Sequence, residues 1–360
     1  MPVGKPPPLL SLIILLIGWL VSLATLAQQH TDFIPLSLPS PHLLEAQVTF
    51  GQDAHGQVWL VTEHGLSVYR DGQFHSYRRF DVNDAIIGGV FQGDVVFLAT
   101  ASGLYRLSLA TPSARLSLVW APPVASQAQG SDPILSLSAM PASNTAEGKP
   151  NATVLYVQTR SALFRVLSSR LAPAVSTSGT EARQIHSLAD PQALMMRGLD
   201  SGLMILANRQ LSYFSELEAS WQSLAIPIDV TDMAVFEQAV YVVDDEGQLY
   251  VGDPFGWVES QGLTRHTFAD RVTGLLVAQD GLYARSGDYL VGLQAPGYRI
   301  KDASQSDARF VDASNNIWLG TPHDIQVAWW QPVAARTLSS VELEWAKREA
   351  SVETKLLDAS

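Results

Sequence analysis

The sequence predicts an all-β protein, a seven-bladed β-propeller of four-stranded blades. The first observation behind this prediction is a segment that recurs near the two ends of the chain. Residues 53–66 read DAHGQVWLVTEHGL, and residues 312–325 read DASNNIWLGTPHDI. Each copy is a polar turn, a short apolar strand with one tryptophan, a tight turn and a second strand. Because a few short strands cannot bury their faces alone, such repetition predicts modules that stack on one another.

The second observation is a spacing that recurs between these two copies. A large anchor residue is followed by Thr three positions on, Gly six positions on and Leu seven positions on, with substitutions in the weaker copies. Most gaps between anchors are near the period of about 40 residues that is typical of a propeller blade. The anchors and their followers are Trp59 (Thr62, Gly65, Leu66), Phe97 (Thr100, Gly103, Leu104), Tyr156 (Thr159), Met204, Tyr241 (Gly247), Tyr283 and Trp318 (Thr321).

We interpret these repeated residues as structural. Aromatic anchors supply the area that two packed sheets must bury between blades. The glycines Gly65, Gly103 and Gly247 are expected in tight turns with a left-handed backbone. The hydroxyls of the repeated threonines are expected to bond backbone groups of the turns.

Alternation of apolar and polar residues places the strands of the clearest blades. The propeller is expected over residues 31–333. Its last blade lacks an outer strand after residues 325–330, and residues 33–39 are expected to supply it and so close the ring. The other expected strands are 46–53, 57–61, 66–70 and 73–77 in blade one, 85–92, 94–98, 103–109 and 115–120 in blade two, and 133–140, 153–157 and 163–166 in blade three.

The two ends of the chain follow different patterns. Residues 1–30 hold an apolar run after Lys5, which predicts a signal peptide or an uncleaved anchor in the inner membrane. The propeller is therefore expected to be periplasmic, secreted or membrane-anchored. Residues 334–360 are expected to form a helical tail, because Ser339 and Glu342 have the spacing of a capping box before a helix over residues 340–357.

Composition excludes several function classes. The formal net charge is −12 and no cluster of Lys and Arg occurs, so nucleic acid is not an expected partner. The chain has no cysteine, which excludes disulfides, thiolate metal sites and cysteine nucleophiles. No catalytic constellation and no cofactor motif are found, and the chain is expected not to be an enzyme.

Several candidate sites are weighed against structural roles. The turns after the anchors should face one side of the ring, which would place His64 and His323 on adjacent blades. Equivalent positions on packed sheets lie about 10 Å apart, however, which is too far for these two histidines to share a metal ion. Residues 244–247 resemble part of a calcium loop but lack its alternating ligands, which favours a hairpin turn. Trp257, Trp329 and Trp330 could stack on a sugar, although a core role is expected. The residues five positions after the anchors are His64, Ser102, Ser161, Arg209, Glu246, Asp288 and His323.

The pattern D-x-x-G-x-V-W-L-x-T-x-x-G-L of residues 53–66, followed by YRDGQF at residues 69–74, resembles the repeat of two-component regulator propellers. Those are periplasmic sensor portions of bacterial hybrid sensor kinases and of some cyclic-dinucleotide synthases. The resemblance implies an extracytoplasmic sensor whose ligands are often glycans or their fragments, and it assigns no ligand-binding residue.

Such sensors continue into a β-sandwich, a second membrane span and a signalling module, whereas here one short helix is expected after the propeller. We therefore expect a stand-alone propeller that binds or senses an unknown small molecule or glycan fragment, or that contacts a membrane signalling protein. A periplasmic platform for protein assembly is the alternative, and a propeller lyase or lactonase is a third.

Overall fold

The computed structural model divides the chain into two units, residues 1–31 with 330–360, and residues 32–329. The predicted terminal helices lie outside the described residues. No helix in the described ranges is long and apolar enough to cross a bilayer. The structure describes residues 28–30, 34–36, 49–63, 65–79, 84–111, 114–123, 132–140, 152–169, 180–188, 194–199, 201–224, 228–236, 239–252, 264–266, 271–277, 281–293, 299–301, 308–320 and 325–332.

The first unit contributes one small sheet. Strand β1 (Gln28–His30) pairs antiparallel with β30 (Trp330–Pro332), and Gln29 lies opposite Gln331.

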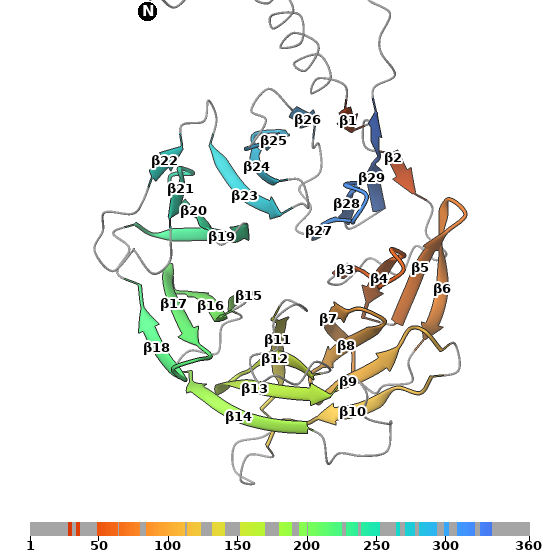
Figure 1. Ribbon diagram of the computed structural model, residues 1–360, viewed down its shortest axis with the longest axis vertical. Coiled ribbons are helices and arrows are strands. Elements are labelled where there is room, and N and C mark those ends of the chain that lie inside the picture. Colours follow the sequence, from red (N-terminus) through yellow and green to blue (C-terminus); the bar gives the residue numbers. More distant parts are fainter. Residues whose placement is uncertain are drawn as a thin grey trace, which may run out of the picture. The chain divides into compact units, whose positions relative to one another are not determined.

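The second unit is the predicted seven-bladed propeller, which is confirmed. Seven antiparallel sheets of four strands follow one another around a centre (Figure 1). One edge strand of each sheet lies nearest that centre, and the strands of a blade are counted outward from it. From the inner to the outer strand, blade one is β3 (Thr49–Gln52), β4 (Val58–Thr62), β5 (Gly65–Arg70) and β6 (Gln73–Arg79); blade two is β7 (Ile86–Gln92), β8 (Val95–Thr100), β9 (Gly103–Ser108) and β10 (Ser117–Trp120); and blade three is β11 (Ile134–Ala139), β12 (Ala152–Thr159), β13 (Ala162–Ser169) and β14 (Thr180–Ser187). Blade four is β15 (Met195–Leu199), β16 (Gly202–Ala207), β17 (Gln210–Ser215) and β18 (Ser220–Ser223); blade five is β19 (Val230–Phe236), β20 (Ala239–Asp244), β21 (Leu249–Gly252) and β22 (Thr264–His266); blade six is β23 (Val272–Val277), β24 (Leu282–Ser286), β25 (Tyr289–Gly292) and β26 (Arg299–Lys301); and blade seven is β27 (Ala308–Val311), β28 (Ile317–Gly320), β29 (Ile325–Ala328) and β2 (Ile34–Leu36).

Blade seven combines strands from the two ends of the second unit. Strand β2, within the segment 33–39, is its outer strand and pairs antiparallel with β29. Pro35 lies opposite Gln326 in this pair. Proline has no N–H to donate, which is compatible with an edge strand. The ring is therefore closed by backbone hydrogen bonds between segments far apart in the sequence.

The anchor residues lie on the second strand of each blade, where both faces of the sheet are covered. Trp59 and Trp318 are each 1% exposed. Trp318 packs with Phe74 of blade one, and the two ring centroids are 5.9 Å apart. Tyr241 is less enclosed and only partly buried at the edge of a cluster that also contains Val272 and Ala284. Each of these side chains fills space between adjacent blades.

An aspartate explains why the turn and the tryptophan recur together. In blade one, Asp53 Oδ1 accepts hydrogen bonds from the backbone N–H of His55 and of Gln57, both at 2.9 Å. Its Oδ2 accepts from Trp59 Nε1 at 2.9 Å. Blade seven repeats the arrangement with Asp312, which accepts from Trp318 Nε1 at 2.9 Å. One carboxylate therefore fixes the turn between the first two strands and orients the buried indole.

A third copy of this turn lies at a different place in blade five. Asp244 accepts a hydrogen bond from the backbone N–H of Gln248 at 2.7 Å, and Tyr250 donates its hydroxyl to Asp244 Oδ2 at 3.1 Å. These residues join the second and third strands, so residues 244–247 are a hairpin turn. In the sequence repeat Leu249 follows its anchor Tyr241 by eight positions and not by seven, and the longer turn accounts for this difference.

The turn after the second strand has a consistent hydroxyl contact. The hydroxyls of Thr62, Thr100 and Thr159 donate to the carbonyls of the residues three positions on, at 3.4, 3.3 and 3.1 Å. Thr321 lies outside the described residues.

Gly103 and Gly247 occupy their positions in these turns for different reasons. Gly247 has a φ of +80°, as expected for a left-handed position. The same expectation for Gly103 is wrong, because its φ is not positive. A Cβ there would lie 2.8 Å from Leu118 Cδ1, so an alanine at this position would displace the exposed side chain of Leu118 on the neighbouring outer strand.

Adjacent blades are also joined by a repeated backbone hydrogen bond. The first residue of an inner strand donates its N–H to the turn of the preceding blade. In the same strands the pairing register shifts just after that residue, as in a β-bulge, which turns a backbone group away from its own sheet. The four pairs are Ile86 to Glu63 (3.0 Å), Ile134 to Ala101 (3.0 Å), Val230 to Arg209 (3.1 Å) and Val272 to Gly247 (2.9 Å), with shifts in β7, β11, β19 and β23.

A buried ion pair links blades three and four. Arg165 Nε lies 2.7 Å from Glu216 Oε2, and the two side chains are 12% and 6% exposed. Tyr156 donates its hydroxyl to Glu216 Oε1 at 2.7 Å. Burial first, and then the negative charge of Glu216, raise the pKa of Tyr156 well above its ordinary value.

Replacement of Asp312 by alanine tests the role of the repeated aspartate. Asp312→Ala leaves the buried indole N–H of Trp318 and two turn N–H groups without acceptors, and we expect a loss of about 2–4 kcal/mol in the free energy of unfolding. Urea unfolding measures this loss. The control is Asp245→Ala, which removes an exposed ion pair to Arg209 and should cost at most about 1 kcal/mol. Equal effects in the two variants would contradict the structural role.

Tyr156→Phe tests the link between blades three and four through the pH dependence of stability. Above pH 10, an unfolded chain loses the Tyr156 proton while the folded chain retains it, so stability present below pH 10 falls as pH rises. One such group contributes a slope of about 1.4 kcal/mol per pH unit. We expect Tyr156→Phe to flatten this alkaline loss, as measured by urea unfolding between pH 9 and 11. The exposed Tyr289→Phe should keep the wild-type slope, and an unchanged slope in Tyr156→Phe would refute the assignment.

Candidate ligand-binding cavity

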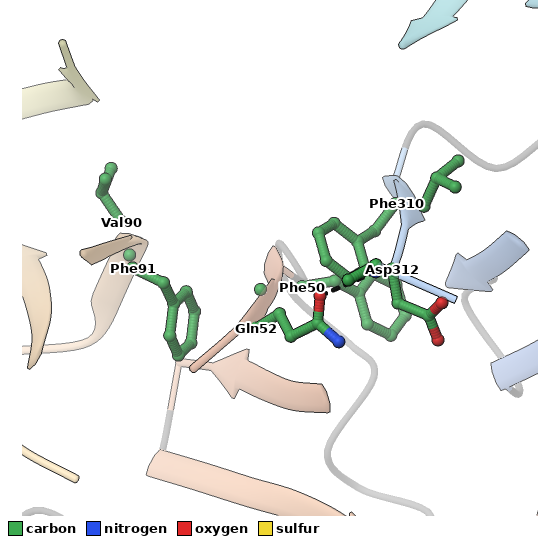
Figure 2. A pocket seen from close by; sticks show the side chains of 10 residues that line it. Phe50, Gln52, Val90, Phe91, Phe310 and Asp312 are labelled. Atoms are coloured by element: carbon green, nitrogen blue, oxygen red, sulfur yellow. Dashed lines mark hydrogen bonds between the residues drawn. The ribbon is translucent and has the colours of Figure 1, made fainter. Parts of the chain in front are cut away.

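A cavity of about 510 Å³ lies at the carboxyl ends of three neighbouring inner strands, β27, β3 and β7. These strands belong to blades seven, one and two, so the cavity adjoins the closure of the ring. Figure 2 shows the lining side chains. The lining residues are Phe50, Gly51, Gln52, Gly89, Val90, Phe91, Phe310, Val311, Asp312 and Ala313.

Three phenyl rings contribute to the apolar part of the lining, together with Val90, Val311 and Ala313. Phe50 and Phe310 stack across the closure, with ring centroids 6.5 Å apart and an interplanar angle of 15°. Phe91 lies on the other side of β3, where a Cβ on Gly51 would come within 1.9 Å of its Cδ2. The absence of a side chain at Gly51 therefore allows Phe91 to lie directly against the backbone of β3. In Figure 2, Gln52 lies between Phe91 and the pair of stacked rings.

The polar side chains of the lining already have partners. Gln52 Oε1 accepts from the backbone N–H of Ala313 at 2.8 Å, and its Nε2 donates to the carbonyl of Gly56 at 2.7 Å. Asp312 is 4% exposed, and its carboxylate accepts from the backbone N–H groups of Ser314 and Asn316 and from the side chains of Asn316 and Trp318. Among the described residues of the lining no side chain is cationic, and the carboxylate of Asp312 accepts hydrogen bonds from four donors.

The cavity lies at the opposite end of the sheets from the turns considered in the sequence. Gln52 and Asp312 adjoin the turns between the first and second strands, and successive hairpins of a sheet lie at alternate ends. Ser102, Ser161, Arg209, Glu246 and Asp288 lie in turns between the second and third strands. His64 and His323 lie outside the described residues.

The other sequence candidates that the structure describes do not line the cavity. Among the described residues, no group of three His, Asp or Glu side chains could hold a metal ion. Arg209 lies 3.3 Å from both Asp229 and Asp245, and all three side chains are exposed. Trp329 is partly buried, with its ring centroid 5.6 Å from that of Trp318. Trp257 and the side chain of Trp330 lie outside the described part.

Comparisons with solved structures identify the fold. No family model and no curated protein matches the sequence. The extracellular domain of a putative one-component system from B. thetaiotaomicron is 15% identical with a TM-score of 0.54, over 83% of this chain and 40% of that chain. The chain thus spans about two fifths of the length of that sensor domain. The resemblance to sensor propellers is confirmed in the fold.

Propellers with other activities share the same fold. Virginiamycin B lyase from Staphylococcus aureus, in complex with quinupristin, is 11% identical with a TM-score of 0.56, over 84% of this chain and 99% of that one. BBS1N in complex with ARL6DN is 12% identical with a TM-score of 0.58, over 85% and 98%. At such identities the similarity establishes the architecture and leaves the activity to the site itself.

Replacement of Gly51 tests the packing that shapes the cavity. Gly51→Ala places a methyl group within the ring of Phe91, and we expect Phe91 to be displaced and the free energy of unfolding to fall by about 1–3 kcal/mol. The matched control is Gly88→Ala on β7, because a Cβ there meets nothing within 4 Å. Thermal and urea unfolding measure the difference. Equal stability of the two variants would show that Phe91 does not lie against Gly51.

Proposed function

We propose that this propeller is a non-enzymatic extracytoplasmic binding protein that holds a small molecule or a glycan fragment in the cavity between β27, β3 and β7. The observation that carries this proposal is the lining itself. A volume of about 510 Å³ falls within the range of small-molecule sites, and phenyl rings with a few fixed polar groups are typical of them.

The chemistry of the lining supports binding over catalysis. General acid–base catalysis needs a titratable group that can reach the ligand and exchange a proton. Asp312 is the one ionisable side chain among the lining residues that the structure describes, and its oxygens accept hydrogen bonds from the turn and from Trp318. Such a site can bind and orient a molecule without transforming it.

Two observations support an extracytoplasmic location and a sensing role. Residues 9–27 are apolar and follow Lys5, as in an export signal or anchor. The fold is that of an extracellular domain from a putative one-component system. In this proposal, occupancy of the cavity is communicated to a membrane signalling protein.

The test is thermal unfolding of the protein with a panel of glycans and metabolites. A ligand at 100 times its Kd adds about 2.7 kcal/mol to the free energy of unfolding and raises Tm by several degrees. We expect at least one compound to do so, and Phe310→Ala to abolish the rise while the free variant remains folded. A panel without effect, or an equal rise in the variant, would argue against the cavity as the binding site.

Two observations favour a protein-assembly platform as the second candidate. BBS1N, a propeller of the same fold, was crystallised in complex with ARL6DN. On this chain, Leu217 is 95% exposed in the turn between β17 and β18. A platform should retain a defined protein from membrane extracts, and Leu217→Asp should release it. A lyase, the third candidate, has support only from the shared fold.

A further inference from the structure

We propose that the ligand of this cavity is a short, extended, uncharged peptide that pairs with the inner edge of β3 and packs two successive apolar side chains against Phe91 and Phe310. The inference rests on the proposed function of the cavity and specifies the class of its ligand.

The register of β3 determines which backbone groups face the cavity. Asp53 donates its N–H to the carbonyl of Gln57 at 3.1 Å, so Asp53 points its backbone groups toward β4. In an antiparallel ladder this orientation alternates along the strand. Gly51 therefore also faces β4, opposite Trp59, while Phe50 and Gln52 point their N–H and C=O groups away from it.

No strand within the described residues pairs with this outward edge. Strand β3 is the terminal strand of its sheet, and β4 is its one partner there. Phe50, Gly51 and Gln52 all line the cavity. Residues two apart in a strand are separated by about 6.8 Å. That is the spacing at which an added strand exchanges main-chain hydrogen bonds with an exposed edge.

The two walls determine the side chains of such a ligand. Phe91 lies against β3 on the side of Gly51, and Phe310 stacks on Phe50 on the other side. A strand added to β3 continues the pleat of blade one, so its successive side chains point alternately to the two faces. One side chain would therefore meet Phe91 and the next would meet Phe310. Both rings are partly buried phenyls, which favours apolar partners.

The polar groups of the lining favour an amide over a charged or hydroxyl-rich ligand. None of the lining residues in the described ranges is cationic, and Asp312 places a carboxylate beside the cavity. A ligand with a free carboxylate would lose hydration without gaining a counter-charge. A sugar would bring many hydroxyls to a lining in which the amide oxygen and nitrogen of Gln52 are already bonded to Ala313 and Gly56. Main-chain amides, in contrast, match the N–H and C=O groups on the edge of β3.

Calorimetric titration of the full-length protein tests the proposal. The probe is N-acetyl-Leu-Leu-amide, which we expect to bind. The same peptide methylated on the amide nitrogens of both leucines keeps its apolar surface but loses the N–H that would pair with β3 in either register, and should bind at least tenfold more weakly. N-acetyl-Gly-Gly-amide, which lacks the side chains, and N-acetyl-Leu-Leu with a free carboxylate should also bind at least tenfold more weakly.

Variants locate the binding on the protein. Phe91→Ala and Phe310→Ala should each weaken the probe at least tenfold. The matched control is Phe236→Ala, which removes a partly buried phenyl at the end of the inner strand β19 in blade five. Thermal unfolding of each free variant establishes that it is folded at the titration temperature, and the control should bind as the wild type does.

The outcomes separate this inference from the proposed function. Equal binding of the methylated peptide would overturn strand pairing, and equal binding by the Phe91 and Phe310 variants would overturn the location. Binding of a neutral oligosaccharide that is lost in Phe310→Ala, with no peptide binding, would refute the peptide class and leave the cavity as the ligand site. Failure of peptides, oligosaccharides and metabolites alike would count against both proposals.

Discussion

The propeller depends on the closure of its ring in blade seven, where β2 pairs with β29. Three residues of β2 provide that pairing, which is little backbone to hold two ends of a chain together. Buried residues of blades seven and one also pack in one shared cluster. Trp318 packs edge-on against Tyr69 at 4.8 Å, and Gln52 bonds the backbone of Ala313, 261 residues away in the sequence. The closure therefore combines the backbone pairing of β2 with β29, aromatic packing between blades seven and one, and a side-chain hydrogen bond between these two blades.

The candidate site follows from the same closure. The lining combines strands β27, β3 and β7, so a molecule in the cavity contacts blades on both sides of the junction. Phe50 and Phe310 belong to the packed junction and also face the cavity. A bound ligand would add contacts where the ring is joined, which couples binding to the stability of the closure. Under the proposed function, this coupling would allow the propeller to report that its cavity is occupied.

The sequence predicted the fold because the repeated feature, an aspartate bonded to a nearby tryptophan, lies within a single hairpin. Asp53 and Trp59 are six residues apart and bond each other within one hairpin, so the pattern survives in a single stretch of sequence. The cavity could not be predicted in this way, because its lining joins three inner strands that share no repeated motif. A glycine within a strand was the sequence signal that could have indicated the cavity, since Gly51 allows the close approach of Phe91. The expectation of a left-handed backbone at Gly103 was wrong for a related reason, because the nearest contact of a Cβ there is with Leu118 on another strand.

An engineered disulfide tests the closure most directly, because the natural chain has no cysteine. Pro35 and Gln326 are opposite each other in the pairing of β2 with β29, and facing residues of antiparallel strands lie within disulfide reach. Pro35→Cys with Gln326→Cys should cross-link under mild oxidation of the native protein and raise its stability to urea. The off-register pair Pro35→Cys with Val327→Cys directs its thiols to opposite faces and should remain reduced. Cross-linking of both pairs alike, or of neither in the native state, would contradict a ring closed by β2.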